Sequence, residues 1–198
     1  MSLGLTNLAP RPTRLAQDVH AAEQVQGAHE LIALMRRHYP RVGLFVGIGV
    51  GRAFQQSVGI DKAKQRKGAG RVCDEAASQT RKEGAAADTD ACAHHVTIAI
   101  PSNIPVVDDA EFGLDVGLMR VAIRHERLRQ ADDEQEHRMP CTLLFAMPST
   151  SGRVTTHQLP QKAACAARAR ILTEFLAAHA KGQGHACGPL KEVSLRLL

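Results

Sequence analysis

The longest apolar run of the chain covers residues 42–51 (VGLFVGIGVG) and has an arginine on each side. Its length and its β-branched residues predict a buried strand over 42–48 that runs into a glycine-rich turn. A helix is expected before it, because apolar residues recur every three or four positions from Thr13 until Tyr39-Pro40 ends the pattern. The apolar stripe of this helix consists of Leu15, Val19, Ala22, Val25, Ala28, Ile32 and Met35.

Further strands are expected in the middle of the chain. Residues 53–65 fit a short helix, and Val96–Ile100 then alternates β-branched residues up to Pro101, which is typical of a strand. Cys141–Met147 is another apolar run of strand length, and residues 153–157 are its predicted hairpin partner.

Two further helices are expected in the second half of the chain. Asp108 and Glu111 have the spacing of a capping box, and the apolar positions behind them keep helical spacing. Those positions are Leu114, Leu118, Val121, His125 and Leu128. A C-terminal helix is predicted from Pro160 to Lys181, and the tail 190–198 fits either a strand or a helix. The predicted inner face of the C-terminal helix consists of Ala164, Ala167, Ile171, Phe175 and Ala178, widened by Leu172 and Leu176.

The alternation of these elements favours an α/β fold. We predict a small layered domain of about three or four strands with three main helices and a long irregular basic insertion. Residues 1–13 contain two prolines and are expected to form a flexible lead-in to a single domain over 14–198. Residues 67–92 have no apolar period, which predicts a loop or disordered insertion.

Composition limits the classes of protein to consider. Hydrophobic residues make up 44% of the 198 residues but aromatic residues only 3%, so Leu, Val and Ile must fill the core. The five cysteines are odd in number and scattered, which does not suit a disulfide framework. No signal-peptide pattern and no membrane-spanning run of about 18 apolar residues is present, so we expect a cytoplasmic protein with no membrane partner.

Glycines that follow a strand raise the question of a phosphate site. The dinucleotide fingerprint G-x-G-x-x-G/A needs glycine or alanine at its sixth position, but a motif that starts at Gly47 has Arg52 there and one that starts at Gly49 has Phe54. The phosphate-loop pattern fails as well. A glycine turn beside an arginine can still hold an anion, and the predicted site consists of Gly47, Gly49, Gly51 and Arg52. The alternative is a tightly packed strand exit without a ligand.

Two thiol–imidazole pairs raise the question of a metal. Cys92 and His94 form one pair, and His185 and Cys187 form the other; together they would make a tetrahedral Cys₂His₂ set for zinc. The spacing matches no zinc-finger pattern, so we predict no cofactor and keep zinc as the alternative. His125-Glu126 is not a zincin motif, because position 129 is Arg.

The net charge of +5 is compatible with a polyanionic partner. The densest basic cluster consists of Lys62, Lys64, Arg66, Lys67 and Arg71. Such a segment would contact the phosphates of nucleic acid or of another polyanion without reading sequence. No aromatic residue is interleaved for base stacking, and the alternative is a solvated loop balanced by nearby acidic residues.

Three functional hypotheses follow from the sequence. The first is a non-catalytic binding or accessory domain whose basic insertion, residues 62–82, contacts an anionic partner. The second is a small enzyme that binds a phosphate-containing substrate at the glycine-rich strand exit near Arg52. The third is a doubtful reading frame without evolved function, which the abundance of Ala, Arg, His and Gln allows.

Overall fold

The computed structural model describes residues 3–12, 18–60, 95–107, 116–125, 140–151, 157–180 and 188–198. Within these ranges lie three helices and five strands. Their order is α1 (Ala21–His38), β1 (Val42–Val46), α2 (Ile48–Ser57), β2 (His95–Pro101), β3 (Gly117–Arg124), β4 (Cys141–Met147), α4 (Leu159–Ala180) and β5 (Leu190–Leu197). The α/β class with three main helices is therefore confirmed, whereas the predicted count of three or four strands is too low.

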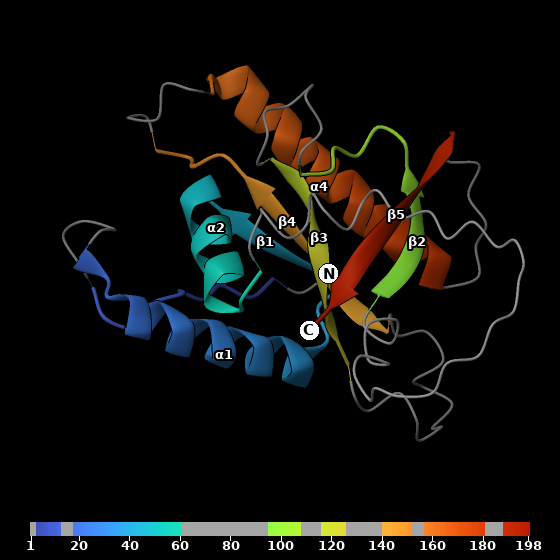
Figure 1. The fold of residues 1–198 in the computed structure, drawn as a ribbon. Coiled ribbons are helices and arrows are strands. Elements are labelled where there is room, and N and C mark those ends of the chain that lie inside the picture. Colours follow the sequence, from blue (N-terminus) through green and yellow to red (C-terminus); the bar gives the residue numbers. More distant parts are fainter. Residues whose placement is uncertain are drawn as a thin grey trace, which may run out of the picture.

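The five strands form one mixed sheet in the order β1-β4-β3-β5-β2 (Figure 1). The pairs β1–β4 and β3–β5 are parallel, and the pairs β3–β4 and β2–β5 are antiparallel. Helices α1 and α2 pack on one face of this sheet, and α4 packs on the other. The result is a three-layer arrangement with a hydrophobic core on each side of the sheet.

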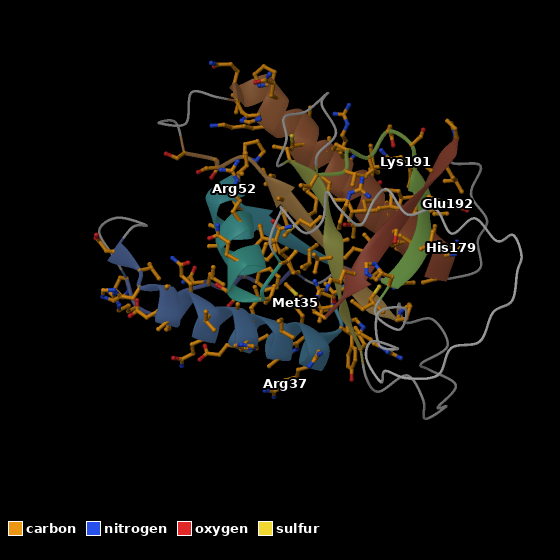
Figure 2. The ribbon with its side chains drawn as sticks, in the orientation of Figure 1. Met35, Arg37, Arg52, His179, Lys191 and Glu192 are labelled. Carbon is orange, nitrogen blue, oxygen red and sulfur yellow. The ribbon has the colours of Figure 1, made fainter. Side chains whose placement is uncertain are left out.

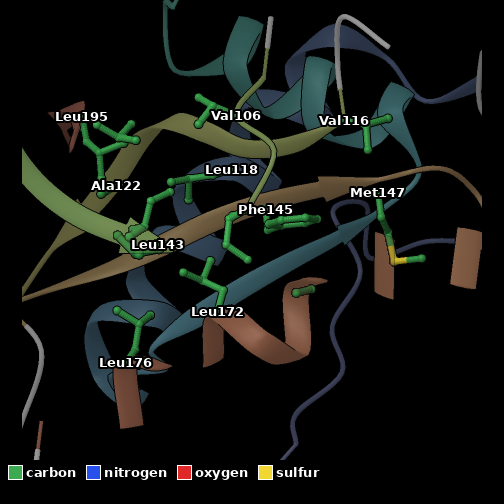
Figure 3. Packing of buried hydrophobic residues seen from close by; sticks show 14 of the residues in the cluster. Val106, Val116, Leu118, Ala122, Leu143, Phe145, Met147, Leu172, Leu176 and Leu195 are labelled. Atoms are coloured by element: carbon green, nitrogen blue, oxygen red, sulfur yellow. The ribbon is translucent and has the colours of Figure 1, made fainter. Parts of the chain in front are cut away.

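Strand β4 supplies side chains to both cores. Leu143, Phe145 and Met147 pack with the buried face of α4, as Figure 3 shows. The alternate residues Leu144 and Ala146 pack with α1 and α2. All seven residues of β4 are buried, which explains why the sequence reads there as a continuous apolar run instead of an alternation.

The helix predicted behind the capping box is wrong where the structure describes it. Leu118 and Val121 lie in strand β3, and His125 follows directly after that strand. The capping residues Asp108 and Glu111 lie outside the described residues. Because β3 is buried on both faces, its apolar residues are nearly continuous, and such a run satisfies helical spacing as easily as strand spacing.

Helix α1 starts later than predicted, at Ala21, with His20 as its N-cap. It ends as expected at Tyr39, which adopts the left-handed conformation before Pro40. The N-terminal segment crosses this helix at Gly27, where an added Cβ would clash with the Leu8 carbonyl oxygen. Arg11 also pairs with Glu23 of α1, and this contact lowers the pKa of the Glu23 carboxyl to about 2.

The structure shows which face of the C-terminal helix is buried and which conformation the C-terminal tail adopts. The buried residues of α4 are Lys162, Cys165, Ala169, Leu172, Leu176 and Ala178. Burial of Leu172, Leu176 and Ala178 agrees with the prediction, whereas the first half of the helix buries 162, 165 and 169 in place of 164 and 167. The tail forms β5, which pairs between β3 and β2 instead of lying at a sheet edge. The predicted hairpin partner over 153–157 lies outside the described residues except for His157.

A buried polar contact joins β1, β3 and β4 at the end of the sheet where β1 begins. The Thr142 hydroxyl donates to the Pro40 carbonyl oxygen at 2.6 Å and lies 2.8 Å from Nε2 of His125. Since the hydroxyl has one hydrogen, Nε2 must be the donor to Thr142. The ring of Tyr39 packs edge-on against His125 at 5.0 Å, so the contact also fixes the turn between α1 and β1.

We expect Thr142→Val to lower the free energy of unfolding by about 1–3 kcal/mol, because it leaves buried donors and acceptors without a partner. Thr97→Val on the exposed side of β2 is the matched control and should change little. Urea unfolding followed by circular dichroism measures both variants. A Thr142→Val midpoint equal to wild type would contradict this contact, and a wild-type transition without cooperativity would favour the doubtful reading frame.

Candidate anion-binding site

The connections that follow the parallel strands β1 and β4 lead to opposite faces of the sheet. Both strands end at the same edge of the sheet, where Val46 pairs with Met147. The chain continues from β1 into α2 on one face, whereas the helix that follows β4 is α4 on the other face (Figure 1). In open α/β sheets, ligands bind outside the carboxyl ends of strands at such a topological switch point.

Gly47 alone forms the turn between β1 and α2. Its φ of 125° belongs to a region that favours glycine, its N–H donates to Met147 O at 2.9 Å, and its carbonyl accepts from Val50 N at 3.0 Å. The predicted strand over 42–48 therefore ends two residues early. The predicted glycine-rich turn is wrong in extent, because Gly49 and Gly51 lie inside the first turns of α2.

The other two glycines serve different purposes. A Cβ at Gly51 would lie 3.4 Å from Ala146 Cβ and 3.8 Å from Phe45 Cβ, so its absence lets α2 sit close to the sheet. A Cβ at Gly49 would meet nothing within 4 Å, so this residue faces open space. Turn, open approach and close packing are the roles of the three glycines in dinucleotide-binding folds, although the spacing here is different.

The start of α2 presents the positive end of a helix dipole. The N–H groups of Ile48 and Gly49 belong to the first turn, where an α-helix supplies no acceptors, and Gly47 offers no capping side chain. The first turn contains no acidic residue, so the positive end of the helix dipole is not neutralised by α2 itself. Arg52 adds a full charge one turn further along, at the same end of α2 (Figure 2).

The loop after β4 lies beside Gly47. The Ser149 Cβ is 4.0 Å from the position that a Cβ of Gly47 would occupy, and the Ser149 hydroxyl accepts from Ser151 N at 3.2 Å. Lys162 of α4 donates from Nζ to the Ser151 carbonyl oxygen at 2.9 Å and is only 9% exposed. A lysine is therefore held against this loop by α4.

None of the described acidic side chains belongs to β1, α2 or β4, the elements that meet at this edge. Within the described ranges they are Asp18, Glu23, Glu30, Glu174 and Glu192. The first three lie on or just before α1, and the others lie in the second half of α4 and near the start of β5. The described residues at the ends of β1 and β4 thus combine N–H donors and cations, an arrangement suited to an anion.

Some residues of this candidate site were predictable from the sequence. The structure brings Gly47, Gly49, Gly51 and Arg52 together on one turn and the helix start, as neighbours in sequence must be. Sequence reasoning missed the contribution of Ser149, Ser151 and Lys162. A signal for Lys162 existed, since it continues the 165, 169, 172, 176 stripe toward the helix start at a spacing that would otherwise carry an apolar residue.

The remaining predicted site residues lie outside the described residues. These are the basic cluster Lys62, Lys64, Arg66, Lys67 and Arg71, and the thiol–imidazole set Cys92, His94, His185 and Cys187. The structure does not test either prediction. Within the described ranges, no group of three or more His, Cys, Asp or Glu side chains could hold a metal. Cys141 and Cys165 are free and buried, and burial raises the pKa of the Cys141 thiol to about 11.

None of the helices in the described part of the chain is long and apolar enough to cross a membrane. Comparison of the chain with protein-family models, with curated proteins and with solved structures gave no match. The functional assignment therefore depends on the geometry at the ends of β1 and β4.

Proposed function

We propose that the protein binds a small phosphate-containing molecule at the carboxyl ends of β1 and β4. The observation that carries this proposal is the start of α2, where the N–H groups of Ile48 and Gly49 lie at a topological switch point and Gly49 faces open space. Phosphate is the anion class of best fit, because several oxygens can accept from adjacent backbone N–H groups at once.

The neighbouring side chains support the same ligand class. Arg52 supplies a guanidinium that can pair with two phosphate oxygens, and it follows Gly49 by one helical turn. On the other side of the switch point, the Ser149 loop provides a hydroxyl and is held in position by Lys162. Binding is the activity proposed; an enzyme acting on the bound molecule is the further alternative.

Removal of Arg52 should weaken phosphate binding. We expect inorganic phosphate to raise the melting temperature of the wild-type protein, and Arg52→Ala to lower the affinity about tenfold or more, because a hydrogen bond to a charged group is lost. Thermal shift at increasing phosphate concentration measures this effect. Arg37→Ala, an exposed arginine on α1, is the matched control and should respond like wild type (Figure 2).

Gly49→Ala separates binding from stability in the same assay. Alanine should raise the melting temperature without phosphate, since it favours the helix by about 1 kcal/mol over glycine, and nothing within 4 Å opposes the added methyl group. The same methyl group would occupy the approach of the anion, so the phosphate-dependent shift should shrink. A wild-type protein that does not respond to phosphate, or a full response in Arg52→Ala, would contradict the proposed site.

We also propose, on sequence charge alone, that residues 62–82 contact a polyanion such as nucleic acid. Affinity should then fall steeply with salt, and combined replacement of Lys64, Arg66 and Lys67 by Ala should weaken binding to all sequences alike. Each lost phosphate contact should reduce the salt slope by about one. Fluorescence anisotropy with single- and double-stranded oligonucleotides measures this slope, and salt-independent binding would rule the proposal out.

A further inference from the structure

Among the described strands, β1 lies at an edge of the sheet and pairs only with β4. Leu143 N donates to Arg41 O at 3.0 Å, and Gly47 N donates to Met147 O at 2.9 Å. These two bonds show that residues 41, 43, 45 and 47 direct their backbone groups toward β4. The N–H and C=O groups of Val42, Leu44 and Val46 therefore point away from the sheet, and no described residue pairs with them.

Two of these residues also expose apolar side chains. Leu44 is 43% exposed and Val46 is 47% exposed, because α4 packs over β4 and β2 and leaves the β1 end of its face open. Edge strands in soluble proteins usually carry a charged residue, a proline or a bulge that blocks pairing with another chain. Within Val42–Val46 none of these is present.

We propose that two copies of the chain pair antiparallel through β1, about a two-fold axis at Leu44, and that Arg41 of each copy completes the anion site of the other. The occupant of the edge is a second copy because the edge complements itself. About this axis Leu44 faces Leu44 of the other copy and Val42 faces Val46, so every outward N–H and C=O finds a partner.

If the two-fold axis is moved by one residue in either direction, fewer backbone N–H and C=O groups form hydrogen bonds between the copies. A shift of the axis to Gly43 sets Val46 opposite Pro40, which has no N–H. A shift to Phe45 sets Val42 opposite Ile48, which already belongs to α2. The axis at Leu44 gives about six hydrogen bonds between the copies and brings the exposed Leu44 and Val46 side chains together across the seam.

The helices on the other face are compatible with this pairing. Helix α2 contacts both β1 and β4, so its axis lies close to the line between these strands. Paired strands lie about 4.8 Å apart, which puts the two copies of α2 about 10 Å from each other. This distance is within the normal range for packed helices, so α2 does not block the seam.

The register also determines what reaches the anion site. With the axis at Leu44, Arg41 of one copy lies opposite Gly47 of the other, as a pair without backbone hydrogen bonds and with Cα atoms about 4.5 Å apart. The side chain of Arg41 follows the alternation of Gly43 and Phe45, and Phe45 packs with α1 and α2. It therefore extends along the face on which the other copy's α2 begins.

This second part depends on the proposed function. Without an anion, Arg41 would approach the positive helix start and Arg52 of the other copy, which is unfavourable. With a phosphate between them, the two cations and the helix start surround one negative group. Anion binding and dimer formation should therefore strengthen each other by the same factor.

Sedimentation velocity of the full chain tests the dimer. We expect a concentration-dependent dimer for wild type, and Leu44→Lys should raise the dissociation constant at least about tenfold, because the seam would bury a charge. Leu190→Lys on β5 is the matched control, since Leu190 is 52% exposed and β4 and β3 separate β5 from β1 in the sheet. A wild-type chain that stays monomeric at all concentrations, with and without phosphate, would overturn the proposal.

Amide hydrogen exchange gives the register without a substitution. The Leu44 and Val46 amides should exchange slowly only at concentrations where the dimer forms, whereas the Gly43 and Phe45 amides, which bond to β4, should be protected at every concentration. Fast, concentration-independent exchange at Leu44 in a dimeric sample would show that the copies pair elsewhere, and would overturn this interface.

The Arg41 contribution is tested with inorganic phosphate. Phosphate should lower the dimer dissociation constant about tenfold for wild type and for the control Arg37→Ala, but should have no effect on Arg41→Ala. One outcome would overturn the role of Arg41 but not the proposed function. In it, the dimer dissociation constant does not change with phosphate, although phosphate raises the melting temperature and Arg52→Ala abolishes this rise. Loss of that melting shift in wild type would instead remove the proposed function and leave the dimer to be judged from sedimentation.

Discussion

Burial of β4 on both faces of the sheet is the constraint on which the structure depends. This strand pairs with β1 on one side and β3 on the other, and its alternate side chains enter two different cores. Phe145 and Leu143 face α4 (Figure 3). Leu144 and Ala146 face α1 and α2. A polar residue inside β4 would disturb the core that its side chain enters, which explains why the hydroxyl of Thr142 is hydrogen-bonded.

Close approach of the first two helices to the sheet follows from small residues. Gly43 lies where a Cβ would be 2.6 Å from the Met35 methyl carbon of α1, and Gly51 lies where a Cβ would touch Ala146 of β4. Because these positions have no side chain, α1 comes close to β1 at Gly43, and α2 packs against β1 and β4. The start of α2 is thereby fixed at the edge where both strands end, and its free N–H groups gain a defined orientation.

Local patterns of the sequence predicted the elements whose apolar residues follow a single period. The body of α1, the β1 strand, the strands at Val96–Ile100 and Cys141–Met147 and the C-terminal helix all appear in the structure. The spacing of apolar residues in β3 predicts a helix wrongly, because a run buried on both faces satisfies either period. The inner face of the first half of α4 is not predictable in the same way, since its alanines make several faces equally apolar.

The candidate site was predictable only from its glycines. Gly47 and Arg52 were evident in sequence, but the parallel pairing of β1 with β4 joins residues about one hundred positions apart, and no local pattern encodes it. That pairing creates the switch point, places Ser149 beside Gly47 and brings Lys162 to the loop after β4. The residues of the site are therefore brought together by the strand pairing and not by a local sequence motif.

The central claim is that the first turn of α2 receives an anion, and an NMR titration tests it most directly. Inorganic phosphate added to ¹⁵N-labelled protein should shift the Ile48 and Gly49 amide signals in a saturable way, because these N–H groups would donate to the bound oxygens. Amides of β2 and the second half of α4 should remain unchanged. Unchanged Ile48 and Gly49 signals at saturating phosphate would contradict the account.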